Sequence, residues 1–335
     1  MVARTGVAGM TMRIGIDIGG TKTDAVALAA DGSVAAQHRS ATGFGAAAVL
    51  SSAEAAVREL ARAAGVEPSD FTTIGVGIPG AVDRASGRVA HAVNLGLEDL
   101  DLGRELAARL GRPVRVENDV NAAALGAWQA LGGGTSDSMA YLNLGTGLAA
   151  GLVLGGQLWR GSRGVAGEIG HIPVDPAGPI CPCGQRGCLE LAASGSGLAR
   201  SWVGGDGASV RELFTAAAAG DLEATLVRDR LVEHVAAAVR LLVLTVDPDR
   251  VVIGGGLSSL GDELLGAVRT VLQGWAASSG FLAMLDLPER VEMLPRDFPA
   301  AAVGAALVGA AAGSTPAEGT HAGSNVGGDQ AVGAS

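Results

Sequence analysis

The sequence predicts an α/β protein with two domains built on a duplicated unit. Its 335 residues exceed the size at which one hydrophobic core usually keeps growing, which favours two domains. Strand-like and helix-like segments alternate along the chain, as they do in α/β proteins. An alternating strand runs into a glycine-threonine turn twice, at 16–21 and at 142–147. Such self-similarity indicates duplication, although two glycine hairpins can also resemble each other by chance.

The first half of the chain contains four strand patterns and two helix patterns. The expected strands are 13–18, 24–28, 73–77 and 114–116, the last of which stops at Glu117-Asn118-Asp119. Apolar residues at helical spacing predict a helix at 46–64, which Gly65 ends, and an alanine-rich helix at 120–131. Hydrophobic periodicity therefore gives the order of elements in this half.

The second half repeats the pattern and ends in a polar tail. A strand at 250–253 runs into Gly254-Gly255-Gly256, and a helix is expected from about Ser258. Residues 201–221 are typical of a helical insert with flexible joints. Residues 1–12 form an expected flexible leader, in which Met12 is an alternative start, and residues 313–335 form an expected disordered tail because they lack apolar periodicity.

Composition excludes several classes of partner. The net charge of −10 and the pI near 5.0 oppose general affinity for nucleic acid or an anionic membrane. Two uncharged stretches, 138–159 and 298–317, are long enough to span a bilayer. Polar residues and glycines interrupt the first, and the second is mostly Ala and Gly. No secretory signal pattern is present, so we expect a cytoplasmic protein with reduced thiols.

Three cysteines and one histidine indicate a metal site. Cys181, Cys183 and Cys188 have the spacing C-x-C-x4-C, and His171 precedes them by ten positions. Three thiolates and one imidazole are a ligand set that Zn²⁺ takes in tetrahedral structural sites. A disulfide with one cysteine left over is the alternative. The odd number of cysteines and the strain of bridging a C-x-C pair argue against it.

Three glycine clusters predict a nucleotide site. Each exposes backbone N–H groups without side chains that would block a phosphate. Asp17 is placed to hold Mg²⁺ through water, while Thr21 and Lys22 offer a hydroxyl group and a positive charge. A single Gly-Gly hairpin is common in β proteins, and neither a P-loop nor G-x-G-x-x-G is present. The nucleotide interpretation depends on three groups: Asp17, Gly19, Gly20, Thr21 and Lys22; Gly145, Thr146 and Gly147; and Gly254, Gly255 and Gly256.

Asp119 is the candidate general base. It follows Asn118 at the end of a strand, where a side chain points into the cleft at the edge of an α/β sheet. Its carboxylate could accept the proton of a substrate hydroxyl that attacks phosphorus. The alternative is a helix N-cap, a position that favours both Asn and Asp.

Two further carboxylates lie near the zinc ligands and suit a polyol. Glu168 precedes His171 by three residues, and Glu190 follows Cys188 by two. If one ring nitrogen of His171 binds zinc, the other can only donate, so the metal aims an N–H group into the cleft. The carboxylates would accept hydrogen bonds from neighbouring hydroxyls. In the alternative, Glu168 is a solvated helix residue and His171 is only a metal ligand.

From about Arg13 to Ala312 the chain resembles the ROK family of bacterial sugar kinases and related repressors. The resemblance rests on seven motifs that together are highly specific. They are Asp17-Ile-Gly-Gly-Thr-Lys22, Ile78-Pro-Gly80, Glu117-Asn-Asp-Val-Asn-Ala-Ala-Ala124, Leu144-Gly-Thr-Gly147, Gly167-Glu-Ile-Gly-His171, Cys181-Pro-Cys-Gly-Gln-Arg-Gly-Cys-Leu-Glu190 and Ile253-Gly-Gly-Gly256.

The resemblance implies an actin-like, hexokinase-type ATPase fold, with two α/β domains around a central cleft. It implies that the last helix returns to the first domain, which would comprise 13–120 and about 300–312, while 121–299 form the second domain with the zinc site. It also assigns roles. Asp119 would be the base, MgATP would lie over the glycine turns, His171, Cys181, Cys183 and Cys188 would hold zinc, and Gly80, Asn118, Glu168, His171 and Glu190 would hold the sugar.

The activity that the resemblance implies is ATP-dependent phosphorylation of the 6-hydroxyl of glucose or a close analogue. An amino sugar (N-acetylglucosamine, N-acetylmannosamine or kanosamine) or a cyclitol is the alternative substrate. A repressor is disfavoured, because only about twelve residues stand where that branch carries a DNA-binding domain. Family members are usually dimers or tetramers. One departure from the family pattern, Ala149 and Ala150 after the second turn, would restrict the backbone near a phosphate.

Overall fold

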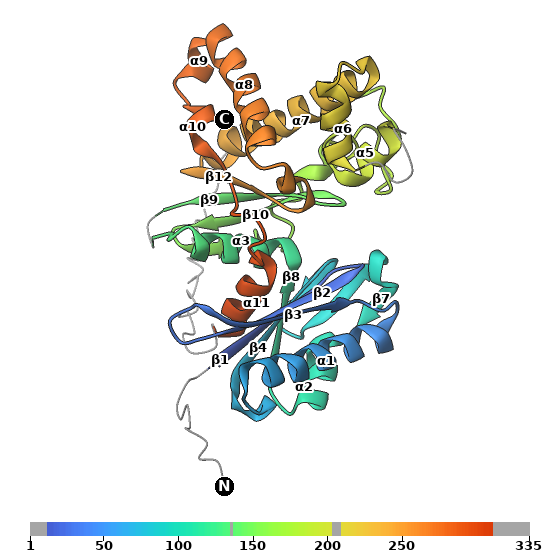
Figure 1. The fold of residues 1–335 in the computed structure, drawn as a ribbon, viewed down its shortest axis with the longest axis vertical. Coiled ribbons are helices and arrows are strands. Elements are labelled where there is room, and N and C mark those ends of the chain that lie inside the picture. Colours follow the sequence, from blue (N-terminus) through green and yellow to red (C-terminus); the bar gives the residue numbers. More distant parts are fainter. Residues whose placement is uncertain (1–11, 135–136, 203–208, 311–335) are drawn as a thin grey trace, which may run out of the picture.

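The computed structural model describes residues 12–134, 137–202 and 209–310. The expected tail at 313–335 lies outside the described residues, as do most of the leader and the middle of the insert at 201–221. Met12, which the sequence assigned to the leader, is instead the first residue of β1 (Met12–Ile18) and is buried in the core. Two five-stranded sheets and one small sheet form the framework (Figure 1).

The first sheet has the strand order β3-β2-β1-β4-β8. β1, β4 (Phe71–Ile78) and β8 (Val114–Asn118) run parallel, while β2 (Lys22–Leu28) and β3 (Val34–Ala41) continue the sheet as antiparallel neighbours. The apolar patterns located four of these strands. β3 gave no such pattern, because it lies at the sheet edge and its side chains are largely exposed.

The second sheet repeats this topology, with the order β11-β10-β9-β12-β13. β9 (Met139–Leu144), β12 (Arg250–Gly254) and β13 (Val291–Met293) are parallel, and β10 (Leu148–Leu154) and β11 (Gln157–Trp159) are antiparallel neighbours. Both sheets thus start from a glycine-turn hairpin and add two parallel strands on the other side. The matching strand orders confirm the duplicated unit.

The outer face of each sheet is covered by amphipathic helices. α1 (Ala46–Ala64) and α2 (Leu102–Leu110) pack on the first sheet, and α7 (Leu222–Val246) and α8 (Asp262–Ser278) pack on the second (Figure 1). α1 has the expected bounds because its apolar residues share one face and Gly65, with φ 69°, ends it in the left-handed conformation. Within the described residues, no helix combines the length and apolar character that crossing a membrane requires.

Two helices rich in small residues lie between the sheets (Figure 1). α3 (Asp119–Ala130) packs on the second sheet and α11 (Ala300–Ala310) on the first, and the two helices contact each other. Glycines make these contacts possible. A Cβ atom on Gly15 would lie 1.8 Å from the carbonyl oxygen of Ala302, and one on Gly304 would lie 1.7 Å from that of Ala122.

One helix begins later than expected. The segment after Gly254-Gly255-Gly256 forms a 3-10 turn, Gly256–Leu260, and α8 begins only at Asp262. Gly261, with φ 61°, separates the two. The other short elements are the antiparallel strands β5 (Ala81–Asp83), β6 (Arg88–Ala92) and β7 (Leu97–Leu100); the 3-10 turns Pro68–Asp70, Val93–Leu95 and Ile169–His171; and the helices α4 (Glu190–Ala193), α5 (Gly195–Ser201), α6 (Val210–Ala218), α9 (Gly280–Ala283) and α10 (Leu287–Arg290).

Candidate active site and metal centre

Two aspartates meet at the carboxyl end of the parallel strands in the first sheet. Asp17 on β1 is paired in register with Gly77 on β4, and Asp119 follows β8, the next strand along. A Cβ atom on Gly77 would lie 3.6 Å from the Cα of Asp119 and 3.8 Å from Oδ1 of Asp17. The two aspartates therefore lie on either side of Gly77, which lacks a side chain to separate them.

The electrostatics of these aspartates differ from those of surface carboxylates. Burial raises the pKa of Asp119 to about 6, and the negative charge of Glu168 adds to the shift. Burial, together with the charges of Asp119 and Asp24, raises the pKa of Asp17 to about 8, against the opposing effect of Lys22. Carboxylates held this close favour a divalent cation between them and a phosphate, and oxygen ligands are those that Mg²⁺ prefers. The residues present thus fit a magnesium–nucleotide complex.

Asn118, rather than Asp119, caps α3. The side-chain Oδ1 of Asn118 accepts hydrogen bonds from the backbone N–H groups of Val120 (3.0 Å) and Asn121 (3.2 Å). Its Nδ2 donates to the carbonyl oxygen of Gly80 at 3.4 Å. The N-cap interpretation of Asp119 is therefore wrong, because Asn118 holds that position and Asp119 is the first residue of the helix. Asn118 has its oxygen committed and keeps an N–H for a ligand.

A cavity of about 440 Å³ lies between the two glycine-turn hairpins. It brings together Asp17, Lys22 and Asp119 from the first half with Gly145, Gly255 and Gly256 from the second. Nζ of Lys22 lies 3.6 Å from Oδ2 of Asp24, and the Lys22 side chain is more than half exposed. The sequence had predicted a nucleotide site at these turns, and the structure brings the turns to one cavity.

The remaining glycine-turn residues lie outside the lining of this cavity. Thr21 and Thr146 accept backbone hydrogen bonds through their carbonyl oxygens, from Thr42 and Ser196 respectively. Gly20 packs against Asn94, where a Cβ atom would lie 3.1 Å from the Asn94 side chain. Within the described residues, the cavity lining does not include Gly19, Gly20, Thr21, Thr146, Gly147 or Gly254.

A second cavity, of about 1190 Å³, adjoins the first. Its lining includes Gly80, Asn118, Glu168 and His171, four of the five residues expected to hold a sugar. Val120 lines both cavities, so the start of α3 forms the boundary between them. Glu168 is exposed and lies before the 3-10 turn Ile169–His171, not within an α-helix.

Ala149 and Ala150 line this second cavity. The backbone N–H of Ala150 donates to the carbonyl oxygen of Gly167 at 2.7 Å, which ties β10 to the segment that carries Glu168. The sequence had placed their methyl groups near a phosphate. The structure places both residues on the Glu168 side, because β10 leads away from the turn at Gly145.

Glu190 is committed to the second glycine turn. Its Oε2 accepts a hydrogen bond from the backbone N–H of Leu148 at 3.2 Å, and a Cβ atom on Gly147 would lie 2.5 Å from the same oxygen. Within the described residues, Glu190 lines neither cavity. It lies near His171 nonetheless, since a Cβ atom on Gly170 would lie 3.4 Å from the Cβ of Glu190.

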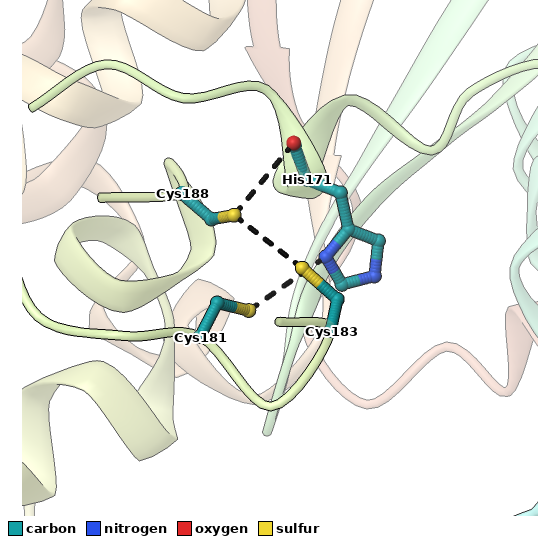
Figure 2. Close-up of side chains that lie close together, drawn as sticks. All are labelled: His171, Cys181, Cys183 and Cys188. Carbon is teal, nitrogen blue, oxygen red and sulfur yellow. Dashed lines mark hydrogen bonds between the residues drawn. The ribbon is translucent and has the colours of Figure 1, made fainter. Parts of the chain in front are cut away.

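The cysteine cluster closes around His171 (Figure 2). All three cysteines are free thiols. Sγ of Cys181 lies 3.9 Å from Nδ1 of His171, and Sγ of Cys183 lies 3.6 Å from Sγ of Cys188. The four candidate ligand atoms lie within 4.8 Å of one another. Zn–S bonds of about 2.3 Å in a tetrahedron place sulfurs ~3.8 Å apart, so the four side chains can hold a structural zinc ion.

His171 faces the metal site and the second cavity with different nitrogens. Nδ1 is directed at Cys181, while Nε2 lies 4.0 Å from Oε2 of Glu168. Zinc on Nδ1 would leave the proton on Nε2, which would then donate toward the cavity. The side chain of Gln185 donates to the carbonyl oxygen of His171 at 3.0 Å and so holds the backbone of the histidine.

Two functional candidates escaped the sequence analysis. Glu117 is buried beside Asn118, and Arg160 reaches it from the end of β11, where Arg160 Nε donates to Glu117 Oε2 at 2.8 Å. Glu117 carried a signal, because it is an acidic residue next to Val116 in a buried strand, where a charge needs a partner. Arg160 carried none, since one arginine beside glycine-rich loop residues is ordinary.

Comparison with known proteins places this geometry in a family. The model of the ROK family matches residues 13–308. The chain is 36% identical over 277 residues to a glucokinase from Thermotoga maritima, covering 76% of this chain and 85% of that enzyme. It is 35% identical over 263 residues to an N-acetylmannosamine kinase from Shigella boydii, covering 77% of this chain and 87% of that enzyme.

A solved structure gives the same result for the fold. A ROK family glucokinase from Streptomyces griseus, crystallised with glucose and AMPPNP, matches with a TM-score of 0.74 and 32% identity, over 90% of this chain and 99% of that chain. The match confirms the expected actin-like, hexokinase-type ATPase fold. The strand topology, the two adjoining cavities and these matches lead to one conclusion: the chain belongs to the ROK family.

Proposed function

We propose that this protein is an ATP-dependent hexokinase that transfers the γ-phosphate of ATP to the 6-hydroxyl of glucose. The observation that carries the proposal is the position of Asp119. It is a half-buried carboxylate with a pKa of about 6. It lines the cavity that contains Asp17, next to the cavity that contains Glu168 and His171. A base whose pKa lies just below neutral pH is suited to accept a proton from a substrate hydroxyl.

The proposed reaction needs one base and two binding sites. The 6-hydroxyl oxygen forms a bond to the γ-phosphorus, the bond between that phosphorus and the β,γ-bridging oxygen breaks, and the hydroxyl proton passes to Asp119. ADP leaves with the bridging oxygen. Asp17 would hold Mg²⁺ through water, and the bound ion would neutralise charge on the phosphates. Lys22 would add a positive charge at the same cavity.

The sugar would be held by hydrogen bonds from both halves of the chain. Asn118 would donate through Nδ2, His171 would donate through Nε2, and Glu168 would accept from a hydroxyl group. Glu190 would complete the set if its carboxylate turned from Leu148 toward the sugar. Gly80 would border the sugar through its backbone, since its carbonyl oxygen already fixes Asn118.

The glycine clusters would bind the nucleotide. Gly145, Gly255 and Gly256 line the cavity of Asp17, and their backbone would accommodate phosphates and adenosine. Residues 19–21, 146–147 and 254, which lie outside the lining, would hold the lining residues of these turns in place. His171, Cys181, Cys183 and Cys188 would hold zinc with a structural role, which keeps the histidine fixed for the sugar.

The arrangement of the chain supports a two-domain enzyme. We assign 12–120 and 300–310 to one domain and 121–299 to the other, because Met12 belongs to β1 and α11 packs on the first sheet. We place the protein in the cytoplasm as a homo-oligomer, a dimer or a tetramer. Light scattering coupled to size-exclusion chromatography would test the oligomer and would exclude it if the mass were about that of one 33.1 kDa chain.

An amino sugar such as N-acetylmannosamine is the second candidate substrate. The named relative from Shigella boydii favours it, and the large cavity beside Glu168 leaves room for an N-acetyl group. A coupled assay for ADP over glucose, mannose, N-acetylglucosamine, N-acetylmannosamine and kanosamine would decide. The quantity to compare is kcat/KM, because discrimination between substrates lies in that ratio. We expect its highest value for glucose. Higher kcat/KM for an amino sugar would select the alternative, and no turnover with any sugar would refute both.

A further inference from the structure

Glu117 is a buried carboxylate at the edge of the first sheet. It lies on β8, its side chain is 2% exposed, and it stands next to Asn118. A buried charge is costly unless partners satisfy it. Two arginines do so here. Oε2 of Glu117 lies 2.7 Å from Nη2 of Arg160 and 3.3 Å from Nε of Arg84.

The two arginines differ in what they join. Arg84 follows β5, which packs beside β8, and its side chain is 51% exposed. Arg160 follows β11, the edge strand of the second sheet, and its side chain is only 21% exposed. Its Nη1 also donates to the carbonyl oxygen of Leu158 at 3.1 Å, which fixes the guanidinium on its own strand. The ion pair with Arg160 therefore links the edge strands of the two sheets.

The other oxygen of Glu117 organises the start of α3. Oε1 accepts hydrogen bonds from the backbone N–H of Asn118 and from Nδ2 of Asn121, both at 3.2 Å. Asn118 caps the helix and contacts Gly80, and Asp119 is the first residue of that helix. A short path of hydrogen bonds thus runs from Arg160 through Glu117 to the residues that border Asp119.

We propose that Arg160 is a positioning residue: through Glu117 it sets the geometry of Asn118 and Asp119 from the opposite sheet. The assignment rests on the proposed sugar kinase function for its kinetic consequence. The two-pronged contact of Nε and Nη2 with Oε2 restrains the carboxylate, as the planar guanidinium does in ion pairs. Any relative movement of the two sheets would act on this pair, so base geometry and sheet arrangement are coupled.

The test uses Arg160→Met, Glu117→Gln, the double variant and Arg160→Lys in the full chain. Arg160→Met should lower kcat/KM for glucose at least tenfold and leave KM for ATP within about twofold, because the path ends at the sugar and base residues. Arg160→Lys should recover part of the loss. Glu117→Gln should weaken the same interaction, so the double variant should be no worse than the more impaired single variant.

A matched control separates positioning from general destabilisation. Arg290 has a similarly buried side chain, 26% exposed, and pairs with the exposed Asp247; it lies on α10 and lines neither cavity within the described residues. Arg290→Met should keep the kinetic constants of the unmodified protein. All assays are run well below the thermal midpoint of each variant. Unchanged sugar kinetics in Arg160→Met, losses that add in the double variant, or an equal loss in Arg290→Met would each overturn the proposal.

Hydrogen exchange provides a readout that does not depend on turnover. Backbone amides at 118–121 should exchange at least tenfold faster in Arg160→Met and unchanged in Arg290→Met. If the unmodified protein phosphorylates no sugar, the proposed function fails while this measurement still tests the positioning role. Unchanged exchange at 118–121 in Arg160→Met would refute that role whatever the substrate proves to be.

Discussion

Asp119 owes its chemistry to its surroundings. The carboxylate is half-buried, it feels the negative charge of Glu168, and it is not required as the helix N-cap because Asn118 fills that position. Burial disfavours the charged form and raises the pKa, which brings the group near the range where a base works at neutral pH. Removing only its basicity should therefore reveal its role.

We expect Asp119→Asn to lower kcat by ~10²–10⁴, the usual contribution of a general base. The substitution preserves shape and removes a buried charge, so neither the thermal midpoint nor sugar affinity should fall. Steady-state kinetics and calorimetric titration with glucose would measure the two effects. Loss of sugar binding together with turnover would instead assign Asp119 a structural role.

The pH dependence of kcat/KM should report the same carboxylate. A base must be ionised, so activity should decline as pH falls through about 6, the pKa of Asp119. The decline should approach tenfold per pH unit below that value. A pH–rate profile with a stable coupling system would measure it. A decline in kcat/KM that begins only near pH 4, the pKa range of an ordinary aspartate, would contradict the raised pKa.

In the absence of magnesium, the ionised Asp17 carboxylate should lower the free energy of unfolding. Its folded-state pKa is raised from 3.8 to about 8, so between these values the folded protein binds more protons than the unfolded chain. The contribution of protonated Asp17 to the free energy of unfolding is fully present below pH 3.8 and is lost progressively as pH rises through 8. In magnesium-free buffer at pH 8, Asp17→Asn should raise the thermal midpoint by at least about 2 °C and nearly abolish turnover.

The same comparison at pH 5 serves as the control. At pH 5, just above the unfolded pKa of 3.8, only a small part of this stability has been lost, so Asp17→Asn should raise the midpoint much less than at pH 8. A midpoint that falls at pH 8 would show that Asp17 stabilises the fold, contrary to the sign of its pKa shift.

At the scale of elements, α11 depends on glycines to reach its neighbours. Gly304→Ala should destabilise the protein by about 1–3 kcal/mol, the usual cost of overpacking, because the new Cβ would overlap the carbonyl oxygen of Ala122. Thermal unfolding would measure the loss. Gly266→Ala on α8 is the matched control, since its Cβ would meet open space. It should be neutral or slightly stabilising, and an equal loss in both variants would contradict the packing account.

Sequence patterns predicted the elements with strong periodicity and missed those without it. The bounds of α1 followed from one apolar face and a terminal glycine. β3 escaped because an exposed edge strand carries no apolar alternation. The expected start of α8 was early because Ser258 follows a glycine run that forms a 3-10 turn first. Local propensity could not distinguish that turn from a helix.

The site shows the same division between local and long-range information. The zinc ligands, Asp17 and Asp119 were recognisable because each belongs to a compact motif with a chemical reason for its spacing. The hydrogen bond between Glu190 and Leu148 and the ion pair between Arg160 and Glu117 join segments 42 and 43 residues apart. Such contacts depend on the tertiary arrangement of segments far apart in the chain, which no local pattern specifies.

At the scale of the whole molecule, the metal site and the cavity beside Glu168 share one histidine, His171. Nδ1 of His171 faces Cys181 and Nε2 faces Glu168. Removing zinc with a chelator should therefore weaken glucose binding at least tenfold, in line with the loss when groups that orient a site are removed. Titration calorimetry would measure this, with AMPPNP binding as the control. Normal glucose affinity in a folded, zinc-free protein would break the link, and recovery on adding zinc would support it.

The proposed reaction is phosphoryl transfer from ATP to the 6-hydroxyl of glucose, with Asp119 as the base. The most direct test is to incubate the protein with glucose and MgATP and identify the product by phosphorus and proton NMR. We expect glucose 6-phosphate and ADP in equal amounts and no product from 6-deoxyglucose. Formation by Asp119→Asn should be at least a hundredfold slower. Phosphate at another position, or undiminished formation by Asp119→Asn, would contradict it.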